Sequence, residues 1–461
     1  MSGITILDEI VESKRTQLDD QKSAMPLGSF KNQLEPSSRD FAAALRSPRP
    51  GFILECKKAS PSRGLIRSDF DLASIAKLYG RYASAISVLT ESEYFQGSPA
   101  NLGIVKQHAD RPLLCKDFIV DPYQVYQARY FGADAILLIL AILEDQEWLE
   151  LSEIAASLGM AVLTEVSNST EQARAIQLGA AIVGINNRNL RDMSVNLQTT
   201  IDLAEGLPAE TLVVSESGYA THRQVRRMAK TADAFLIGSS LMARNDLEAA
   251  VKSMVFGHCK VCGLTSREDA KHASEVGATY GGVILAEGSP RWVSPSDVNR
   301  VFEDLDLKRV GVFQDQPIDF ILNVAKESRL DVIQLHGDES TEFASRLLSR
   351  REFGFEVWKA MSVAEVQTEG ERWLSHGVSK MLVDNQTVTQ KGGTGESFDW
   401  SLLPDQHRDQ IILAGGIGPS NVAEAMELGC AGVDINSGVE ISPGKKSLEK
   451  LEAAFQAIRN Y

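Results

Sequence analysis

Cysteine is scarce in this chain, and its few copies are scattered. The 461 residues include five cysteines, an odd number without a repeated spacing, so the sequence carries no disulfide framework. We therefore expect a reduced, cytoplasmic setting. Cys259 and Cys262 have C-x-x-C spacing, but no second pair follows and the segment KVCGL resembles a strand, so zinc or redox use is the weaker alternative. We expect neither a metal nor a cofactor.

Long apolar runs are also missing. No stretch approaches the length that a membrane-spanning helix needs. The first residues, MSGITILDEIVESKRTQLDDQK, place apolar residues at helical spacing among acids and bases and lack a small-residue cleavage pattern, which is not how a signal peptide is built. The sequence therefore predicts no contact with a membrane.

Positive charge is in deficit. Lysine and arginine together number 47 against 62 aspartates and glutamates, for a formal net charge of −15. This balance argues against nucleic acid or an anionic membrane surface as a partner. An anionic small molecule would have to bind at local positive sites.

The chain is long and its pattern repeats. A chain of 461 residues exceeds the size at which one hydrophobic core keeps growing, so two domains are expected. Short apolar runs alternate with amphipathic stretches long enough for one helix, eight times in the first half, and the second half repeats the count. This pattern is typical of a (β/α)8 barrel. We predict an α/β fold of two tandem (β/α)8 barrels.

The predicted strands follow one another at short intervals. In the first half they cover residues 52–57, 85–90, 112–117, 135–140, 161–166, 182–186, 211–217 and 234–240, and in the second half residues 260–265, 280–286, 309–313, 332–337, 356–361, 380–385, 411–417 and 432–438.

The two predicted domains cover residues 1–255 and 256–461. Almost no linker separates them, because the segment AVKSMVFGHCKVC indicates that the last helix of the first barrel runs directly into the first strand of the second. The residues before the first predicted strand have apolar positions at helical spacing. They are therefore expected to form a helical N-terminal extension.

Charged and polar residues end several strands of the first predicted barrel. Side chains alternate along a strand, so Glu55 and Lys57 share one face, and at the C-terminal end of a barrel strand such residues lie at the mouth where barrels carry out chemistry. Residues of the same kind end four further strands: Lys116, Glu165, Asn186 and Glu216. Such a cluster is expected to have the shifted pKa values that acid–base catalysis requires. A structural ion-pair network is the weaker alternative, because burying many ions for stability alone is unfavourable.

Glycine-rich turns follow the seventh and eighth predicted strands in both halves. They contain Gly218, Gly238 and Ser239 in the first half, and Gly415, Gly416, Ser437 and Gly438 in the second. Glycine lets the backbone approach an anion, and a helix N-terminus supplies partial positive charge. One such turn alone would be unremarkable, but the same feature at the same two places in both halves predicts two phosphate sites and phosphorylated small molecules as substrates.

The second mouth has different candidates. Cys262 ends the first strand of this half and Asp384 ends the sixth, while Arg291 follows the second strand and His336 ends the fourth. A thiol and a carboxyl on different strands could act as base and acid across a bound sugar. For Cys262 alone, a buried core cysteine is an equally good interpretation. The glycine-rich segment NQTVTQKGGTG follows Asp384, and we expect it to close over a ligand.

Motifs at these strand ends resemble two known enzyme families. Residues 1 to about 255 resemble indole-3-glycerol phosphate synthase through ECKKASPSRG, LTESEYFQGS, CKDFIVDPYQ, LTEVSN, GINNRNL, SESG and IGSSLM. The remainder resembles phosphoribosylanthranilate isomerase through KVCGLT, SPRW, QLHG, GGTGESFDWSLL, AGGIGP and DINSGVE. The tandem order is similar to that of the fused bifunctional enzymes of bacterial tryptophan biosynthesis.

The resemblance to the synthase implies a substrate and a set of roles. The substrate would be 1-(2-carboxyphenylamino)-1-deoxyribulose 5-phosphate, which closes its ring and loses carbon dioxide and then water. Lys116 would be the general acid on the substrate carbonyl, assisted by Lys57, and Glu165 the acid/base partner in dehydration. The same resemblance implies orienting roles for Glu55, Asn186 and Glu216, an anthranilate contact for Arg188, and substrate or phosphate contacts for Ser60, Ser217, Gly218, Gly238 and Ser239.

The resemblance to the isomerase implies an Amadori rearrangement of N-(5-phosphoribosyl)anthranilate. Asp384 would protonate the ring oxygen, Cys262 would remove the C2 proton of the resulting imine, and Arg291 would help to hold the anthranilate. Further substrate or phosphate contacts are implied for His336, Gly415, Gly416, Asp434, Ser437 and Gly438. The C-terminal barrel would thus make what the N-terminal barrel consumes, and because the fusion can replace subunit pairing we expect a monomer.

The sequence departs from the two family patterns at two places. Tyr219 follows SESG where an aliphatic residue is more usual, and the segment 385–391 is longer than in the shortest family versions.

Two other functions are alternatives to this hypothesis. A Schiff-base aldolase could also use Lys57 or Lys116 beside a phosphate site. Alternatively, one barrel could be a non-catalytic binding module, which would lack the strand-end acids and bases found in both halves.

Overall fold

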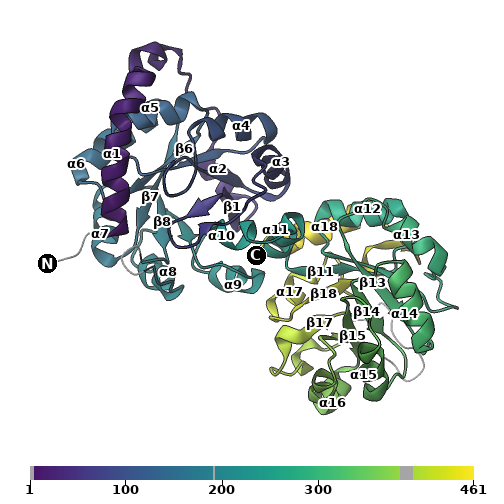
Figure 1. Cartoon of the computed structure of the whole chain (residues 1–461). Coiled ribbons are helices and arrows are strands. Elements are labelled where there is room, and N and C mark those ends of the chain that lie inside the picture. Colours follow the sequence, from purple (N-terminus) through teal and green to yellow (C-terminus); the bar gives the residue numbers. More distant parts are fainter. Residues whose placement is uncertain (1–4, 190–192, 385–397) are drawn as a thin grey trace. The chain divides into compact units, whose positions relative to one another are not determined.

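The computed structural model describes residues 5–189, 193–384 and 398–461 (Figure 1). It divides into two compact units, Met1–Val251 and Lys252–Tyr461, and each is described by itself. The predicted domain boundary after residue 255 lies near the end of helix α11 (Leu247–Phe256). A single residue, Gly257, separates this helix from strand β11 (His258–Val261).

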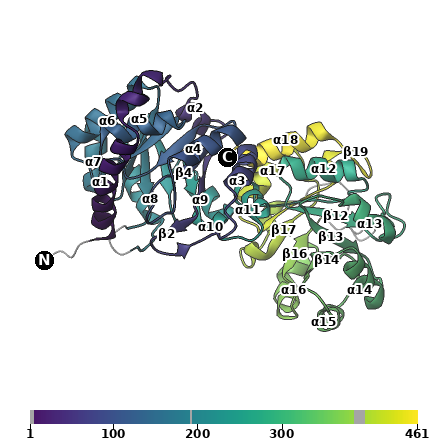
Figure 2. The same ribbon diagram turned by 45° about the horizontal axis from the view of Figure 1, so that its top comes forward.

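The first unit contains a closed barrel of parallel strands in the order β1-β10-β9-β8-β7-β6-β5-β4, which confirms the predicted fold (Figures 1 and 2). The strands are β1 (Gly51–Cys56), β4 (Ala85–Leu89), β5 (Leu113–Lys116), β6 (Ala135–Ile139), β7 (Ala161–Val166), β8 (Ile182–Asn186), β9 (Leu212–Glu216) and β10 (Ala234–Ile237). A small hairpin of β2 (Ala59–Ser60) and β3 (Gly64–Leu65) follows β1.

Alternation along these strands gives the barrel interior its layers. In β7, Leu163 belongs to the interior apolar cluster, so Glu165, two residues further, faces the same side at the end of the strand. The same relation links Val214 to Glu216 in β9 and Ile53 to Glu55 in β1. The interior is therefore apolar up to its C-terminal layer, where the charges begin.

Helices connect the strands of the first unit and surround the barrel (Figure 2). They are α3 (Leu72–Tyr82), α4 (Ala100–His108), α5 (Pro122–Tyr130), α6 (Asp145–Ser157), α7 (Ser169–Gln177), α8 (Gln198–Ala204), α9 (His222–Met228) and α10 (Ser239–Met242). Several begin where a side chain accepts from the free backbone N–H groups of the first turn, as Asp71 does for α3.

The predicted N-terminal extension is helical, as expected. Helix α1 (Ile6–Ala24) starts at a capping box formed by Thr5 and Asp8, and it buries Ile10, Lys14 and Leu18, which are one helical turn apart. Two 3-10 turns, η1 (Leu27–Ser29) and η2 (Lys31–Gln33), follow it.

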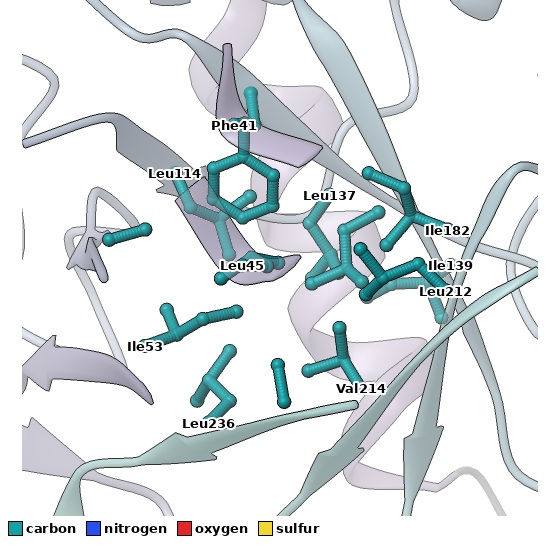
Figure 3. Packing of buried hydrophobic residues seen from close by; sticks show 14 residues of the cluster. Phe41, Leu45, Ile53, Leu114, Leu137, Ile139, Ile182, Leu212, Val214 and Leu236 are labelled. Carbon is teal, nitrogen blue, oxygen red and sulfur yellow. The ribbon is translucent and has the colours of Figure 1, made fainter. Parts of the chain in front are cut away.

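Helix α2 (Phe41–Arg46) closes the N-terminal end of the first barrel. Phe41 and Leu45 are fully buried and pack among the first residues of the strands, including Ala85 and Leu212 (Figure 3). This end of the barrel is thus filled by side chains that come from outside the sheet.

The second unit contains a closed parallel barrel in the order β11 to β18. Its remaining strands are β12 (Tyr280–Ile284), β13 (Lys308–Phe313), β14 (Val332–Leu335), β15 (Glu356–Met361), β16 (Lys380–Val383), β17 (Ile411–Leu413) and β18 (Gly432–Ile435). A short hairpin of β19 (Glu440–Ser442) and β20 (Lys445–Lys446) follows the last strand.

The helices of the second unit depart from strict strand–helix repetition at one place. They are α12 (Arg267–Val276), α13 (Val298–Val301), α14 (Ile318–Glu327), α15 (Thr341–Ser349), α16 (Val363–Ser375), α17 (Val422–Glu427) and α18 (Leu448–Arg459). Between β16 and β17 the structure describes residues 384 and 398–410, where the 3-10 turns η4 (Trp400–Leu402) and η5 (Arg408–Gln410) occur. The expected helix does not occur among these described residues. In the described part of the whole chain, no helix is long and apolar enough to cross a membrane.

Replacing Phe41 by alanine tests the role of α2. Removing a fully buried phenyl ring leaves a cavity, so the free energy of unfolding of the first barrel is expected to fall by about 3–5 kcal/mol. Leu149→Ala on α6 is the matched control, because Leu149 is 37% exposed. Hydrogen exchange read by mass spectrometry resolves the two units. An equal loss in both variants would contradict a closing role for α2.

Candidate functional site

The mouth of the first barrel gathers all six strand-end residues that the sequence singled out. Glu55, Glu165, Glu216 and Asn186 are at most 8% exposed, and they line one cavity of about 360 Å³ together with Lys57 and Lys116. They come from or directly follow β1, β5, β7, β8 and β9. Closure of the barrel brings these separate strand ends to one place.

Ion pairs connect these side chains. The Lys116 ammonium lies 3.3 Å from Glu165 Oε2 and 3.3 Å from Glu216 Oε2. The Lys57 ammonium lies 3.1 Å from Glu55 Oε1. Three carboxylates thus share two ammonium groups, and the Oε1 atom of Glu216 has no hydrogen-bond partner among the described residues.

This arrangement shifts two pKa values. Burial raises the pKa of Glu216 to about 7, the negative charge of Glu165 adds to the rise, and Lys116 opposes it. For Lys116 burial favours the neutral amine, but Glu216, Glu165 and Glu55 together outweigh it and hold the pKa of the ammonium above its usual value. Lys116 is therefore an ammonium at neutral pH, and Glu216 can exchange a proton near neutrality.

Asn186 and Arg188 extend the charged cluster. Asn186 Nδ2 donates to Glu165 Oε1 at 3.1 Å, and the backbone N–H of Arg188 donates to Asn186 Oδ1 at 3.0 Å. The Arg188 guanidinium donates to the carbonyl of Met193 at 2.9 Å and lines the cavity. Burial and the nearby charge of Arg63 lower the pKa of Arg188. Two cationic side chains therefore border this part of the cavity.

The predicted phosphate residues border the same cavity. They are Ser60, Ser217, Gly218, Gly238 and Ser239. The Oγ of Ser60 is buried and has no partner in the described part of the chain. Ser217 has a φ of 68°, a left-handed conformation that is uncommon for a residue with a side chain. Gly238 precedes the first residue of α10, so backbone N–H groups of a short helical turn are available to an anion there.

Apolar wall residues were not predicted from the sequence. The first turns of α1 contribute Ile6, Leu7 and Ile10 to the cavity, and Phe95 and Phe118 contribute aromatic surface. The Lys57 ammonium lies 5.5 Å from the centre of the Phe95 ring. The motif LTESEYFQGS contains Phe95, but nothing local in the sequence shows that it points into the mouth.

A buried ion pair attaches α1 to the barrel beside Lys116. Lys14 Nζ lies 2.7 Å from Asp117 Oδ1, and the two side chains are 3% and 7% exposed. Thr90 at the end of β4 donates to the other Asp117 oxygen. Asp117 directly follows Lys116, so the extension is fixed next to the central ammonium of the mouth.

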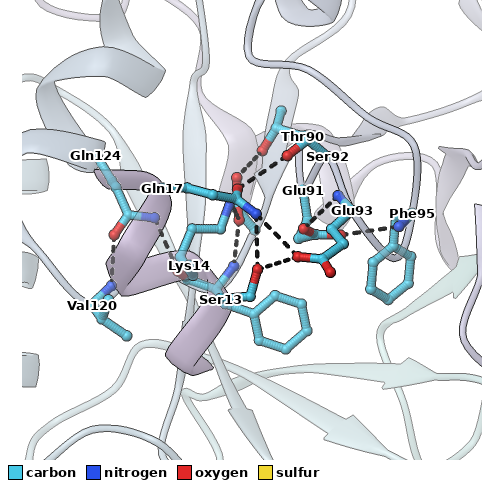
Figure 4. Close-up of polar contacts among 12 residues, drawn as sticks. Ser13, Lys14, Gln17, Thr90, Glu91, Ser92, Glu93, Phe95, Val120 and Gln124 are labelled. Carbon is cyan, nitrogen blue, oxygen red and sulfur yellow. Dashed lines mark hydrogen bonds and ion pairs between the residues drawn. The ribbon is translucent and has the colours of Figure 1, made fainter. Parts of the chain in front are cut away.

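The loop after β4 is also attached to α1. Ser13 and Gln17 donate to the carboxylate of Glu93 (Figure 4). The buried carboxylate of Glu91 accepts from the backbone N–H groups of residues 93, 94 and 95 at 2.7–3.0 Å. These contacts fix the position of Phe95 over the cavity.

Tyr219, the unusual residue after SESG, has a structural explanation. Its hydroxyl is 2.6 Å from Ser215 Oγ, and its ring packs edge-on against Phe235 with centroids 5.0 Å apart. The side chain is buried, so its hydroxyl is hydrogen-bonded as burial requires.

The second barrel positions its candidates on several strand ends. Cys262 follows β11, Asp384 follows β16, and both are buried, at 5% and 9% exposure. Strands β17 and β18 separate β16 from β11 on one side of the barrel, so the carboxyl and the thiol enter the mouth from different sides. His336 follows β14, and its Nδ1 is 3.0 Å from Gln334 Nε2.

Arg291 is held by a residue to which the sequence gave no role. Its guanidinium makes a bidentate contact with Glu440, at 2.9 Å from Nε to Oε1 and 2.8 Å from Nη2 to Oε2. Lys446 Nζ lies 3.0 Å from the same Oε1. The motif DINSGVE ends at Glu440, but only the fold shows that it reaches Arg291.

The predicted phosphate loops of the second barrel meet each other. A Cβ placed on Gly418 would lie 3.1 Å from the carbonyl oxygen of Gly438. Gly415 and Gly416 have φ values of 84° and 65°, and Ser437 opens the 3-10 turn η6 (Ser437–Val439). The glycine-rich segment expected to close over a ligand, residues 385–395, lies outside the described residues.

Asp434 points into the interior of the second barrel. Its Oδ2 accepts from Lys260 Nζ at 2.7 Å. All five cysteines are free, and the Sγ of Cys259 donates to the carbonyl of Phe256. In residues 5–189, 193–384 and 398–461 there is no group of three or more His, Cys, Asp or Glu side chains that could hold a metal ion.

The sequence matches two protein families in tandem. Residues 7–254 match the family described as indole-3-glycerol phosphate synthase, and residues 259–457 match the family described as N-(5'phosphoribosyl)anthranilate (PRA) isomerase. The chain is 49% identical over 459 residues to the tryptophan biosynthesis protein TrpCF of Vibrio parahaemolyticus, an alignment that covers 99% of this chain and 94% of that protein. It is 48% identical over 457 residues to the TrpCF protein of Salmonella typhi, covering 99% of this chain and 100% of that one.

The chain belongs to the TrpCF family of tryptophan biosynthesis proteins. It is a bifunctional enzyme, with the indole-3-glycerol phosphate synthase in its N-terminal part and the phosphoribosylanthranilate isomerase in its C-terminal part. The expected family and the expected pair of activities are thus confirmed.

Lys14→Met tests the attachment of α1. Removing one partner of a buried pair leaves Asp117 uncompensated, so the free energy of unfolding of the first barrel is expected to fall by about 3–5 kcal/mol, with a loss of synthase activity. Lys22→Met is the control on the same helix: Lys22 pairs with Asp121 at the same 2.7 Å, but the two side chains are 40% and 30% exposed. Its effect is expected to stay below about 1 kcal/mol. If Lys14→Met and Lys22→Met had equal effects on hydrogen exchange and on turnover, the attachment of α1 through Lys14 would be contradicted.

Glu216→Gln tests the raised pKa of Glu216. The folded protein binds the Glu216 proton up to a pKa of about 7, whereas the unfolded chain releases it near 4.5, so this group's contribution to stability is lost as the pH rises from about 4.5 to 7. The glutamine variant is expected to gain stability over the parent by about 3 kcal/mol across this interval. Glu205→Gln, an exposed site in the same unit, should show no such trend in urea titrations followed by hydrogen exchange. Parallel pH profiles of parent and Glu216→Gln would contradict the shift.

Proposed function

We propose that the C-terminal barrel converts N-(5-phosphoribosyl)anthranilate into 1-(2-carboxyphenylamino)-1-deoxyribulose 5-phosphate by the residues that line its mouth, and that the N-terminal barrel consumes this product. The observation that carries the assignment of residues is the Lys116 ammonium held between Glu165 and Glu216.

In the synthase half, Lys116 is the general acid on the substrate carbonyl. Its raised pKa keeps it an ammonium at neutral pH, and protonating the carbonyl oxygen makes the carbon open to attack by the anthranilate ring. Closure of the ring is followed by loss of carbon dioxide from the ring carbon that bore the carboxylate, and the electron pair of the broken bond restores the aromatic system. Lys57, paired with Glu55, assists from the end of β1, which β4 separates from β5.

Glu165 is the acid/base partner in dehydration. The hydroxyl formed from the carbonyl leaves as water once it is protonated, while a proton leaves the ring. Glu165 contacts both Lys116 and Asn186, so a proton that it gives or takes can be shared with the lysine. Glu216 and Asn186 orient these groups, and Arg188 meets the anthranilate end of the substrate.

The phosphate binds in the same cavity, at Ser60 and at the turns that follow β9 and β10. Ser60 offers a hydroxyl that has no partner among the described residues, and Gly218, Gly238 and Ser239 offer backbone N–H groups. Ser217, whose backbone is in the left-handed conformation, turns the chain from β9 into this loop. Local donors of this kind bind an anion even though the chain as a whole is acidic.

In the isomerase half, Asp384 is the general acid and Cys262 the general base. Asp384 protonates the ring oxygen of the sugar so that the ring opens to an imine, and Cys262 then removes the C2 proton, which gives an enolamine that becomes the ketone. Entry of the two groups from different sides of the mouth supports these separate roles. Arg291, His336, Asp434 and the loops of Gly415, Gly416, Ser437 and Gly438 bind the rest of the substrate.

The proposal disfavours a Schiff-base aldolase. A lysine that forms an imine must be a neutral amine, which requires a lowered pKa, whereas three carboxylates hold the pKa of Lys116 above its usual value. We also propose that the chain works as a monomer in the cytoplasm. Two complete sets of strand-end residues on one chain and five free cysteines support this.

Alanine variants separate the two sites. Lys116→Ala is expected to lower indole-3-glycerol phosphate formation from either anthranilate sugar phosphate by at least about a hundredfold, because a general acid is lost. Cys262→Ala and Asp384→Ala should abolish use of N-(5-phosphoribosyl)anthranilate only. The readout is product formation by the purified full chain from each substrate in turn.

Cys430→Ala is the control for the thiol, because Cys430 is half-buried outside the mouth. Turnover of both substrates by Cys262→Ala would refute Cys262 as the base, and turnover by Lys116→Ala would refute Lys116 as the acid.

A further inference from the structure

A buried lysine lies directly below Cys262 in the second barrel. Lys260 is 1% exposed and precedes Cys262 by two residues along β11, so both side chains face the barrel interior. Its ammonium lies 2.7 Å from Asp434 Oδ2 on the neighbouring strand β18. The Cε atom of Lys260 and the sulfur of Cys262 both lie next to the same backbone position, Gly282 on β12. The lysine therefore lies beside the proposed base of the isomerase.

Stability alone does not account for this ion pair. Barrel interiors are usually filled by branched apolar side chains, and well-packed apolar residues often stabilise a core as well as a buried ion pair does. Lys260 and Asp434 are paired across β11 and β18 within the interior, and the Oδ1 atom of Asp434 has no partner among the described residues. The arrangement is thus costly to bury and incompletely satisfied.

The neighbouring strand leaves space for the lysine and the thiol. A Cβ placed on Gly282 of β12 would lie 2.9 Å from Lys260 Cε and 3.0 Å from Cys262 Sγ. Contacts this short would force both side chains to shift. Glycine at this position therefore allows the ammonium and the sulfur to lie side by side.

We propose that Lys260 is a positioning residue of the isomerase, which holds the Cys262 sulfur in place and favours the thiolate that abstracts the substrate proton, while Asp434 orients the ammonium. This inference rests on the proposed role of Cys262 as the base. Lys260 itself stays an ammonium throughout and transfers no proton.

The electrostatics of the site agree with this role. Burial raises the pKa of the Cys262 thiol, and the positive charge of Lys260 is the strongest opposing influence. Asp434 adds to the rise, whereas Lys446 opposes it. Arg291 also faces the thiol, but its guanidinium is engaged by Glu440. Without Lys260, burial and Asp434 would act on the thiol with less opposition, and less thiolate would form at neutral pH.

The test measures the acidity of Cys262 directly. Iodoacetamide alkylation of the full chain is followed between pH 6 and about 10 by mass spectrometry of the Cys262 peptide, which separates it from the other four cysteines. Lys260→Met is expected to move the midpoint of the pH profile upward by at least about one unit, and Lys260→Arg to restore most of the shift.

Isomerase kinetics supply the second readout. For Lys260→Met, kcat at neutral pH should fall at least about tenfold and recover as the pH rises, with KM changed much less, because less of the thiol is ionised. A purely structural role would lower activity equally at every pH.

Two further variants keep the test informative if Lys260→Met folds poorly. One is the single variant Asp434→Asn, and the other is the double variant that combines Asp434→Asn with Lys260→Met. The two differ only in the lysine, and the double variant leaves no unpaired carboxylate. The doubly substituted chain is expected to show the higher midpoint. Lys359→Met is the matched control, because Lys359 forms a buried pair with Glu339 at 2.9 Å in the same barrel and should leave the Cys262 profile unchanged.

Equal midpoints for the two Asp434→Asn chains, or an equal shift in Lys359→Met, would overturn the inference. Failure of the proposed function looks different: Cys262→Ala would then keep its isomerase activity, whatever the alkylation profiles of the lysine variants.

Discussion

The mouth of the first barrel depends on one half-buried ammonium held by two buried carboxylates. Lys116 from β5 lies 3.3 Å from Glu165 of β7 and from Glu216 of β9, so three strands must keep their positions for the charges to stay paired. Buried ions are tolerated only with such fixed partners. The apolar layers beneath them supply the rigid support. Burial raises the pKa of Glu216, whereas the neighbouring carboxylates raise the pKa of Lys116 against the effect of burial.

Residues outside the sheet complete the first barrel at both ends. Helix α2 fills the N-terminal end with Phe41 and Leu45, and the start of α1 forms part of the wall of the mouth. The pair between Lys14 and Asp117 joins α1 to the residue after Lys116. The N-terminal extension is therefore part of the site. Helix α1 is distant in sequence from the ends of the barrel strands, but it fixes the loops around Lys116.

The two barrels use lysines at different depths: Lys116 is half-buried, whereas Lys260 is buried. In the first, Lys116 is in the last interior layer and reaches the cavity. In the second, Lys260 and Asp434 lie within the strands, and the thiol of Cys262 lies one layer nearer the mouth. In our proposals Lys116 gives its proton to the substrate of the first barrel, whereas Lys260 affects the substrate of the second barrel only through the sulfur of Cys262.

The sequence by itself determined the sixteen barrel strands and the polar residues at their ends, because strand periodicity is local: Leu163 predicts the face of Glu165, and Ile53 that of Glu55. Only the tertiary structure decided which charges meet. Lys14 with Asp117 and Arg291 with Glu440 join elements distant in the chain. The physical reason is that a buried charge is stabilised by whichever side chain the closed barrel brings within reach, and the charge's own neighbours in sequence do not specify that partner.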